Sequence, residues 1–136
     1  DPLRGKGYVT PLEKIELGQA ERLFLETQKL TVDHVPSEGE TIYLRENSNI
    51  STGGDSIDFT DEIHPSYKRI ASLAAKALDV EITGLDMIIP DIDIPASAEN
   101  YSIIEMNFNP AIHIHCFPYR GKNRHLNSKL MSFLGF

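Results

Sequence analysis

Apolar side chains recur three or four positions apart in two long stretches of the chain, which is the period of a helix with one buried face. We predict helices over 18–29 and 60–78, and a closing helix over 123–133. The second helix is expected to begin at Thr60-Asp61-Glu62, with Pro65 near its first turn. In the first helix the residues expected to face inward are Ala20, Leu23 and Phe24.

Segments rich in β-branched and aromatic residues predict strands at 41–45, 81–90 and 101–108. Residues 91–100 contain Pro95 and read as a hairpin-type loop, so the last two strands are expected to pair antiparallel.

The start of the chain supports two interpretations. Thr10-Pro11-Leu12-Glu13 has the form of a helix capping box with proline at the first helical position. Ile15 and Leu17 instead alternate with charged residues, as in a strand. We favour a short extended piece there.

Polar residues interrupt the two C-terminal strands. Successive side chains of a strand point to opposite faces, so Glu105, Asn107 and Asn109 would share one face. Antiparallel pairing through the hairpin loop would bring Asp86 close to Glu105 and Asn107. Two carboxylates and an amide carbonyl form an all-oxygen set that suits Mg²⁺ or Mn²⁺. The alternative is that Asp86 accepts hydrogen bonds from backbone N–H groups while Glu105 faces water.

A second candidate site is the polar loop over 46–59. Gly53 and Gly54 allow backbone N–H groups to approach an anion closely, and Ser51 and Thr52 add hydroxyl donors. Arg45, at the end of the preceding strand, can bind a phosphoryl or carboxylate group with its planar guanidinium. An ordinary surface loop is the alternative.

A third pattern, His113, His115 and Cys116, raises the question of zinc. In an extended segment the two histidines would share a face while the cysteine points away, and no fourth ligand stands at standard spacing. We favour histidines that pack or hydrogen-bond near a ligand pocket.

Composition narrows the classes of function. With 136 residues the chain has the length of one domain over 1–136, and its one cysteine fits a reducing compartment. A formal net charge of −7 at pH 7 argues against nucleic-acid and membrane partners, which require basic patches. The chain also lacks an initiator methionine, so we expect it to be a piece of a longer protein.

Five motifs resemble one family. They span residues 44–58, 60–65, 84–91, 105–111 and 115–122. Together they cover essentially the whole chain and are similar to the ATP-grasp module of bacterial bifunctional glutamate–cysteine ligase/glutathione synthetases. Over residues 1–86 the chain also resembles cyanophycin synthetase, another ATP-grasp amide ligase.

The resemblance implies an α+β fold, namely the C-terminal subdomain of an ATP-grasp fold with a mainly antiparallel sheet flanked by helices. It implies that Asp86, Glu105 and Asn107 bind Mg²⁺ or Mn²⁺, with two ions expected, which bridge the phosphates of ATP. Arg45 and the loop from Ser51 to Gly54 match the segment that stabilises the transferring phosphoryl group, and Asn109 matches a substrate contact.

The reaction implied by the resemblance joins γ-glutamylcysteine to glycine in a cytoplasmic enzyme. A carboxylate attacks the γ-phosphate of ATP, and glycine then displaces phosphate from the acyl phosphate to give glutathione. The nucleotide-clamping part is expected upstream of Asp1, so we expect an incomplete fragment that is inactive alone. Two alternatives stay open: a cyanophycin-type ligase, and a non-catalytic fragment that forms homo-oligomers through an exposed sheet edge.

Overall fold

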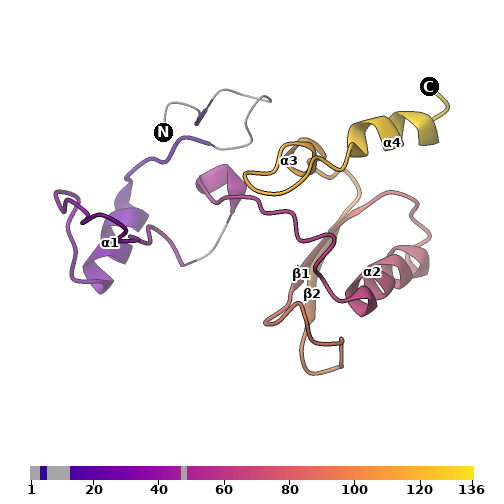
Figure 1. The fold of residues 1–136 in the computed structure, drawn as a ribbon, viewed down its shortest axis with the longest axis horizontal. Helices are drawn as coiled ribbons and strands as arrows, with labels where there is room; N and C mark the ends of the chain where they lie inside the picture. Colours follow the sequence, from indigo (N-terminus) through magenta and orange to yellow (C-terminus); the bar gives the residue numbers. More distant parts are fainter. Residues whose placement is uncertain (1–3, 6–12, 47–48) are drawn as a thin grey trace. The chain divides into compact units, whose positions relative to one another are not determined.

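A computed structural model describes residues 4–5, 13–46 and 49–136 (Figure 1). The chain divides into two compact units, one of residues 1–57 and 117–120, the other of residues 58–116 and 121–136. Each unit is described by itself, and the single domain expected from chain length stays a prediction. The mixture of helices with one antiparallel strand pair agrees with the predicted α+β class. Its assignment to an ATP-grasp subdomain stays a prediction.

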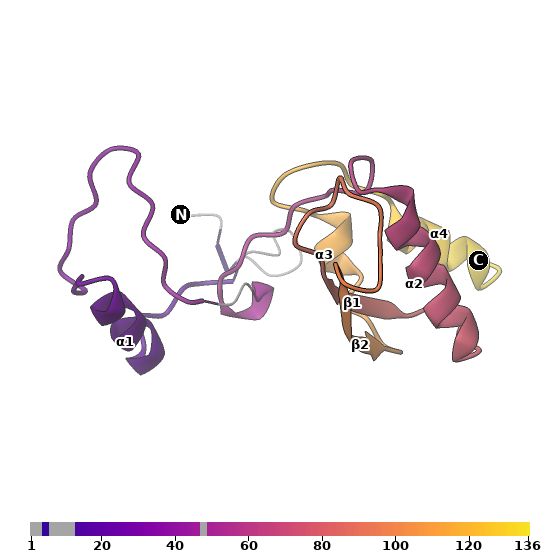
Figure 2. The same ribbon diagram turned by 90° about the horizontal axis from the view of Figure 1, so that it is seen from below.

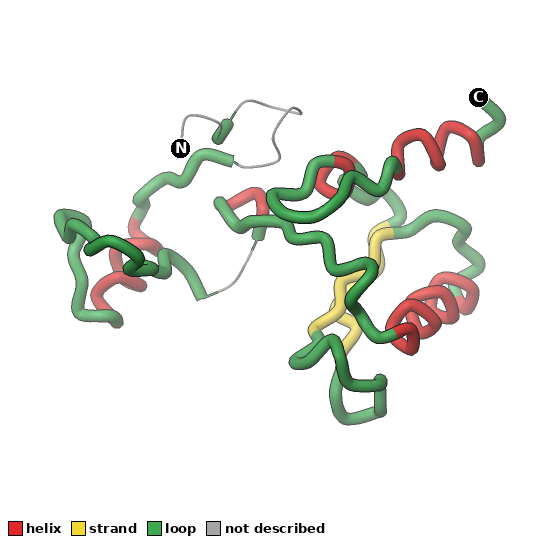
Figure 3. Tube along the Cα trace, in the orientation of Figure 1, coloured by secondary structure: helices red, strands yellow, loops and turns green. Residues whose placement is uncertain are grey.

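The first unit contains helix α1, Gln19–Thr27, within the predicted range. Its buried residues are Glu21 and Leu25, whereas Leu23 is 55% exposed and Ala20 is exposed, so the predicted inward face is wrong. The error arose because an acidic residue was assigned to the solvent side. A short 3-10 helix, η2 (Ile50–Thr52), lies in the predicted polar loop, and loops make up most of the described remainder of this unit (Figure 3).

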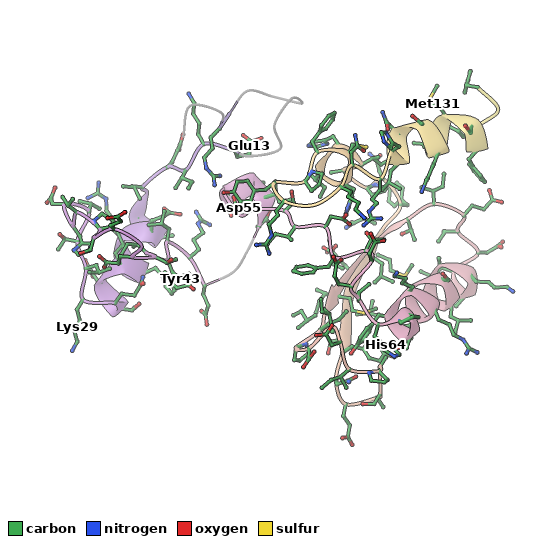
Figure 4. All side chains as sticks on the ribbon, viewed as in Figure 1. Glu13, Lys29, Tyr43, Asp55, His64 and Met131 are labelled. Atoms are coloured by element: carbon green, nitrogen blue, oxygen red, sulfur yellow. The ribbon has the colours of Figure 1, made fainter. Side chains whose placement is uncertain are left out.

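The strand predicted over 41–45 is wrong, because this segment contains no strand. A strand needs a neighbouring strand to accept its hydrogen bonds. The Tyr43 carbonyl instead accepts a hydrogen bond from Nε2 of Gln28 at 2.7 Å. The side chain of Tyr43, labelled in Figure 4, is 64% exposed. At the start of the chain, residues 10–12 lie outside the described residues, and 13–18 have neither helix nor strand.

The second unit contains the predicted hairpin. Strands β1 (Gly84–Ile88) and β2 (Ser102–Asn107) pair antiparallel, as expected, although both are shorter than the apolar runs that predict them. Helix α2, Pro65–Ala77, begins several residues later than Thr60. Proline at the first helical position lacks the N–H that would otherwise need an acceptor, and Nδ1 of His64 accepts the next N–H, from Ser66, at 3.2 Å.

Helix α2 is anchored to the hairpin loop, beside which it lies in both ribbon views (Figures 1 and 2). Tyr67 is 2% exposed, and its ring meets that of Tyr101 edge to face, with centroids 6.2 Å apart. The Ala96 N–H donates to Oγ of Ser66 at 2.8 Å, and the His64 N–H donates to the Ile92 carbonyl at 2.8 Å. These contacts fix one end of the hairpin against the helix.

Two short helices complete the second unit. Helix α3, His113–Cys116, was not predicted, and helix α4, Leu126–Phe133, begins three residues later than the expected range. Cys116 is 2% exposed, and its thiol donates to Oδ1 of Asn127 at 3.6 Å. Within the described ranges, no helix combines the length and apolar character needed to cross a bilayer.

Helices α1 and α2 end in the same way. The residue after each C-cap, Lys29 or Asp79, has a left-handed backbone with φ of 60° or 52°. The following N–H, from Leu30 or Val80, donates back to the carbonyl five residues earlier at 2.9 or 3.1 Å. This is the Schellman arrangement, in which glycine usually occupies the left-handed position.

An ionic cluster joins residues 58–61 to residues 122–124 in the second unit. Nε of Arg124 donates to Oδ2 of Asp58 at 2.8 Å, and Nη1 donates to Oδ1 of Asp61 at 2.9 Å. Nζ of Lys122 donates to the other oxygen of Asp61 at 2.8 Å. The hydrogen bonds from Arg124 hold the pKa of both carboxyl groups well below the usual aspartate value, and they raise the pKa of Arg124 itself.

We expect Tyr67→Ala to lower the free energy of unfolding by about 3–5 kcal/mol, the range for losing a buried aromatic side chain. Tyr43→Ala is the matched control and should change it by less than about 0.5 kcal/mol, because Tyr43 is exposed. Urea unfolding followed by circular dichroism measures both. Equal losses would show that the Tyr67–Tyr101 contact does not anchor the hairpin.

We expect Arg124→Met to lower stability at pH 7, with a difference from the wild type that narrows in acid. Because the folded-state pKa values of Asp58 and Asp61 lie below the ordinary value of 3.8, their stabilisation is present above that pH and is lost as the pH falls below it. Thermal unfolding between pH 7 and pH 2 tests this, with exposed Arg69→Met as the control. A difference that does not depend on pH would contradict the role of the ion pairs.

Candidate functional site

The register of the hairpin brings together the three residues predicted to bind a metal. Asp86 lies directly opposite Glu105, and Gly84 lies directly opposite Asn107. Residues that oppose each other in an antiparallel pair direct their side chains to the same face of the sheet. Nδ2 of Asn107 donates to Oε1 of Glu105 at 2.8 Å, which leaves the amide oxygen of Asn107 to act as a ligand.

A β-bulge makes this arrangement possible. Met87 pairs with Ile103, but Asp86 pairs with Glu105, so Ile104 is an extra residue on β2. In a regular ladder continued from the Met87 pair, Asp86 would oppose Ile104, and Glu105 would point to the other face. Strict alternation from the sequence therefore misplaced Ile104, because the register shift has no signal in the apolar pattern.

The three side chains are solvent-exposed. Two carboxylates directly opposite each other repel, so a divalent cation between them would relieve the repulsion. No hydrogen bond from a backbone N–H to Asp86 is found among the described residues, so the alternative in which such bonds hold Asp86 is not observed. The described part of the chain also contains no group of three or more His, Cys, Asp and Glu residues arranged to hold a metal, and the present set has two carboxylates and one amide.

Asn109 is not positioned as predicted. Strand β2 ends at Asn107, and Asn109 lies in a bend, so strand alternation does not place it on the face of Glu105. A cavity of about 670 Å³ next to the strands is instead lined by Asp86 and Asn107 together with His115 and Lys129, and its other walls are mainly apolar. Because His113 and His115 belong to helix α3, the extended geometry considered for zinc is wrong.

In the first unit, a cavity of about 470 Å³ brings Arg45 together with Thr52, Gly53 and Gly54. Gly53 has φ of 103°, a left-handed conformation that favours glycine. A Cβ atom on Gly54 would lie 2.9 Å from the backbone nitrogen of Asn49, so this close turn also requires glycine. Ser51 does not line this cavity, and its hydroxyl donates to Oδ1 of Asn49 at 2.8 Å.

Sequence reasoning missed two charged residues of this cavity, Arg4 and Glu21. Nη2 of Arg4 donates to Oδ1 of Asp55 at 2.8 Å, and Nη1 donates to the Gly53 carbonyl at 3.3 Å. Glu21 pairs with Arg45. Both partners lie far away along the chain, and no local motif links them, so only the three-dimensional structure reveals the pairs.

Comparisons with known proteins add to this geometry. No protein-family model matches the chain. The chain is nevertheless similar along almost its whole length to enzymes of glutathione biosynthesis, which confirms the resemblance inferred from its motifs.

The similar proteins are bifunctional. The glutathione biosynthesis bifunctional protein of Clostridium perfringens is 62% identical over 134 residues, which are 98% of this chain and 17% of that protein. The protein of the same name from Desulfotalea psychrophila is 62% identical over 136 residues, 100% of this chain and 18% of its own length. The crystal structure of a bifunctional glutathione synthetase from Pasteurella multocida matches with a TM-score of 0.81 and 50% identity, over 98% of this chain and 18% of that one. The chain thus spans less than a fifth of the length of these relatives.

The bulge predicts opposite results for two single-residue deletions in β2. Deleting Ile104 should leave Asp86 opposite Glu105 in a regular ladder, so Mn²⁺ affinity should stay within about twofold of wild type. Deleting Met106 should make Glu105 and Asn107 consecutive residues that point to opposite faces, and Mn²⁺ affinity should fall by at least about tenfold. Calorimetric titration with Mn²⁺ measures both, and circular dichroism checks the fold. Equal affinities would contradict the metal assignment.

Proposed function

We propose that this chain forms part of an ATP-dependent carboxylate–amine ligase that makes glutathione, and that it holds the metal-binding portion of the active site. One observation supports this most strongly: the bulged register of β1 and β2 sets Asp86, Glu105 and Asn107 on one face. The similarity to bifunctional glutathione biosynthesis proteins favours this function over the cyanophycin-type alternative.

In the proposed reaction, a carboxylate oxygen of γ-glutamylcysteine forms a bond to the γ-phosphorus of ATP, and the bond from that phosphorus to ADP breaks. The amine of glycine then attacks the acyl carbon, loses a proton and expels inorganic phosphate. The products are glutathione, ADP and phosphate. Because both steps move negative charge, catalysis consists mainly of positioning and charge stabilisation.

The residues of the hairpin would supply the metal site. Asp86, Glu105 and Asn107 would hold one or two Mg²⁺ or Mn²⁺ ions through oxygen atoms, the ligand type that these ions prefer. When bound, such an ion neutralises charge on nucleotide phosphates. The exposure of all three side chains means that they are accessible to a nucleotide without rearrangement of the hairpin.

The residues of the first unit would bind the transferring phosphoryl group. Arg45 carries a permanent positive charge, and Gly53 and Gly54 permit close approach of backbone N–H groups. Thr52 lines the same cavity and adds a hydroxyl group. The predicted roles of Ser51 and Asn109 have less support, because Ser51 is bonded to Asn49 and Asn109 lies beyond the strand.

The test uses a full-length enzyme in which this chain replaces the matching segment of the Clostridium perfringens protein. We expect Asp86→Asn to reduce ADP release dependent on γ-glutamylcysteine and glycine by at least about 100-fold, because the variant loses one of two metal-binding carboxylates. Asp93→Asn, in the exposed hairpin loop, is the matched control and should retain activity.

Full activity of the Asp86→Asn enzyme would refute the proposed site. ADP release that depends on arginine or aspartate with a peptide, in place of γ-glutamylcysteine with glycine, would instead support the cyanophycin-type alternative. The 136-residue chain assayed alone should show no ligation, since the proposed nucleotide clamp is supplied by the rest of the enzyme.

A further inference from the structure

Glu21 is the one charged residue among the described residues that is buried, with 3% of its surface exposed. A carboxylate removed from water is strongly destabilising unless cations or hydrogen-bond donors surround it. Its position on the first helix therefore needs a reason beyond the helix itself, for which an exposed acidic residue would be sufficient.

The two carboxylate oxygens of Glu21 have different partners. Oε2 accepts a hydrogen bond from the Gly18 N–H at 2.9 Å, which caps the start of α1. Oε1 accepts a hydrogen bond from Nε of Arg45 and forms an ion pair with it. Hydrogen bonds from the backbone of Glu21 itself, from Arg45 and from Gly18 lower the pKa of this carboxyl, so it is ionised at neutral pH.

The contact with Glu21 engages only one edge of the Arg45 guanidinium. Among the described residues Glu21 is its only hydrogen-bond partner, so both terminal nitrogens of Arg45 keep their N–H donors for another acceptor. The Arg45 side chain is 36% exposed and lines the cavity that contains Gly53 and Gly54. A fixed Nε and accessible terminal nitrogens are suited to bidentate binding of a phosphoryl or acyl-phosphate group.

We propose that Glu21 is a positioning residue that orients Arg45 toward the transferring phosphoryl group. This inference rests on the proposed ligase function. An arginine side chain has many rotamers, and holding one of them in advance removes the entropy loss that would otherwise accompany the reaction. The alternative is that Glu21 only caps α1 and that its contact with Arg45 has no effect on turnover.

Two substitutions separate these roles. Glu21→Gln keeps an oxygen that can accept the Gly18 N–H, but its amide cannot form the ion pair with Arg45. Gly18→Pro removes the capping N–H while leaving Glu21 and Arg45 intact, and the φ of −79° at Gly18 lies close to the value that proline requires. If Glu21 positions Arg45, turnover falls in Glu21→Gln and is retained in Gly18→Pro.

The decisive experiment is a double-mutant cycle in the same full-length enzyme. We expect Arg45→Ala to lower kcat by about 100-fold and Glu21→Gln to lower it by about tenfold, with KM for ATP changed by less than about twofold in Glu21→Gln. The double variant Glu21→Gln/Arg45→Ala should match Arg45→Ala alone, because Glu21 acts only through Arg45. Glu26→Gln, an exposed position on the same helix, is the control and should retain full kcat.

Each other outcome has a distinct meaning. Effects of Glu21→Gln and Arg45→Ala that multiply in the double variant, or an unchanged kcat in Glu21→Gln, would overturn the positioning role while leaving the proposed ligase function intact. An unchanged kcat in Arg45→Ala would overturn both the assigned role of Arg45 and this inference. A loss of kcat in Gly18→Pro equal to that in Glu21→Gln, with the same drop in melting temperature, would assign Glu21 to capping alone.

Discussion

The register of one short hairpin determines whether this chain can hold a divalent cation. Strand side chains alternate between faces, so a shift of one residue would separate Asp86 from Glu105 across the sheet. The register next to the loop and the register next to the acidic residues differ by one, and Ile104 accounts for the difference. Anchoring of the loop on α2 through Ser66 and Tyr67 fixes the first register, and the bulge then sets the second.

Arginine–carboxylate pairs have different roles in the two units. In the second unit, Arg124 contacts Asp58 and Asp61 with both ends of its guanidinium, so its hydrogen-bonding capacity is directed within the protein. In the first unit, the pair formed by Arg45 and Glu21 occupies one edge of the guanidinium and leaves the other edge to the cavity. The same pair of residue types therefore stabilises a local fold in one place and presents a cation to a ligand in another.

The sequence predicted the features that depend on local periodicity. The hairpin, its antiparallel direction and the approach of Asp86 to Glu105 all follow from apolar runs on either side of a turn. The strand at 41–45 was wrong because β-propensity does not supply a pairing partner. The bulge and the burial of Glu21 could not be predicted, because the first has no compositional signal and the second depends on an arginine distant in the sequence.

The left-handed residues Lys29 and Asp79, which terminate α1 and α2, bear on how much thermal stability this sequence has left unused. A side chain in that conformation is disfavoured by about 1–2 kcal/mol relative to glycine. Both positions are exposed and lie outside the candidate sites, so exchange for glycine there is a route to heat tolerance that would not disturb chemistry. In this respect the chain keeps an adaptive reserve at its helix ends.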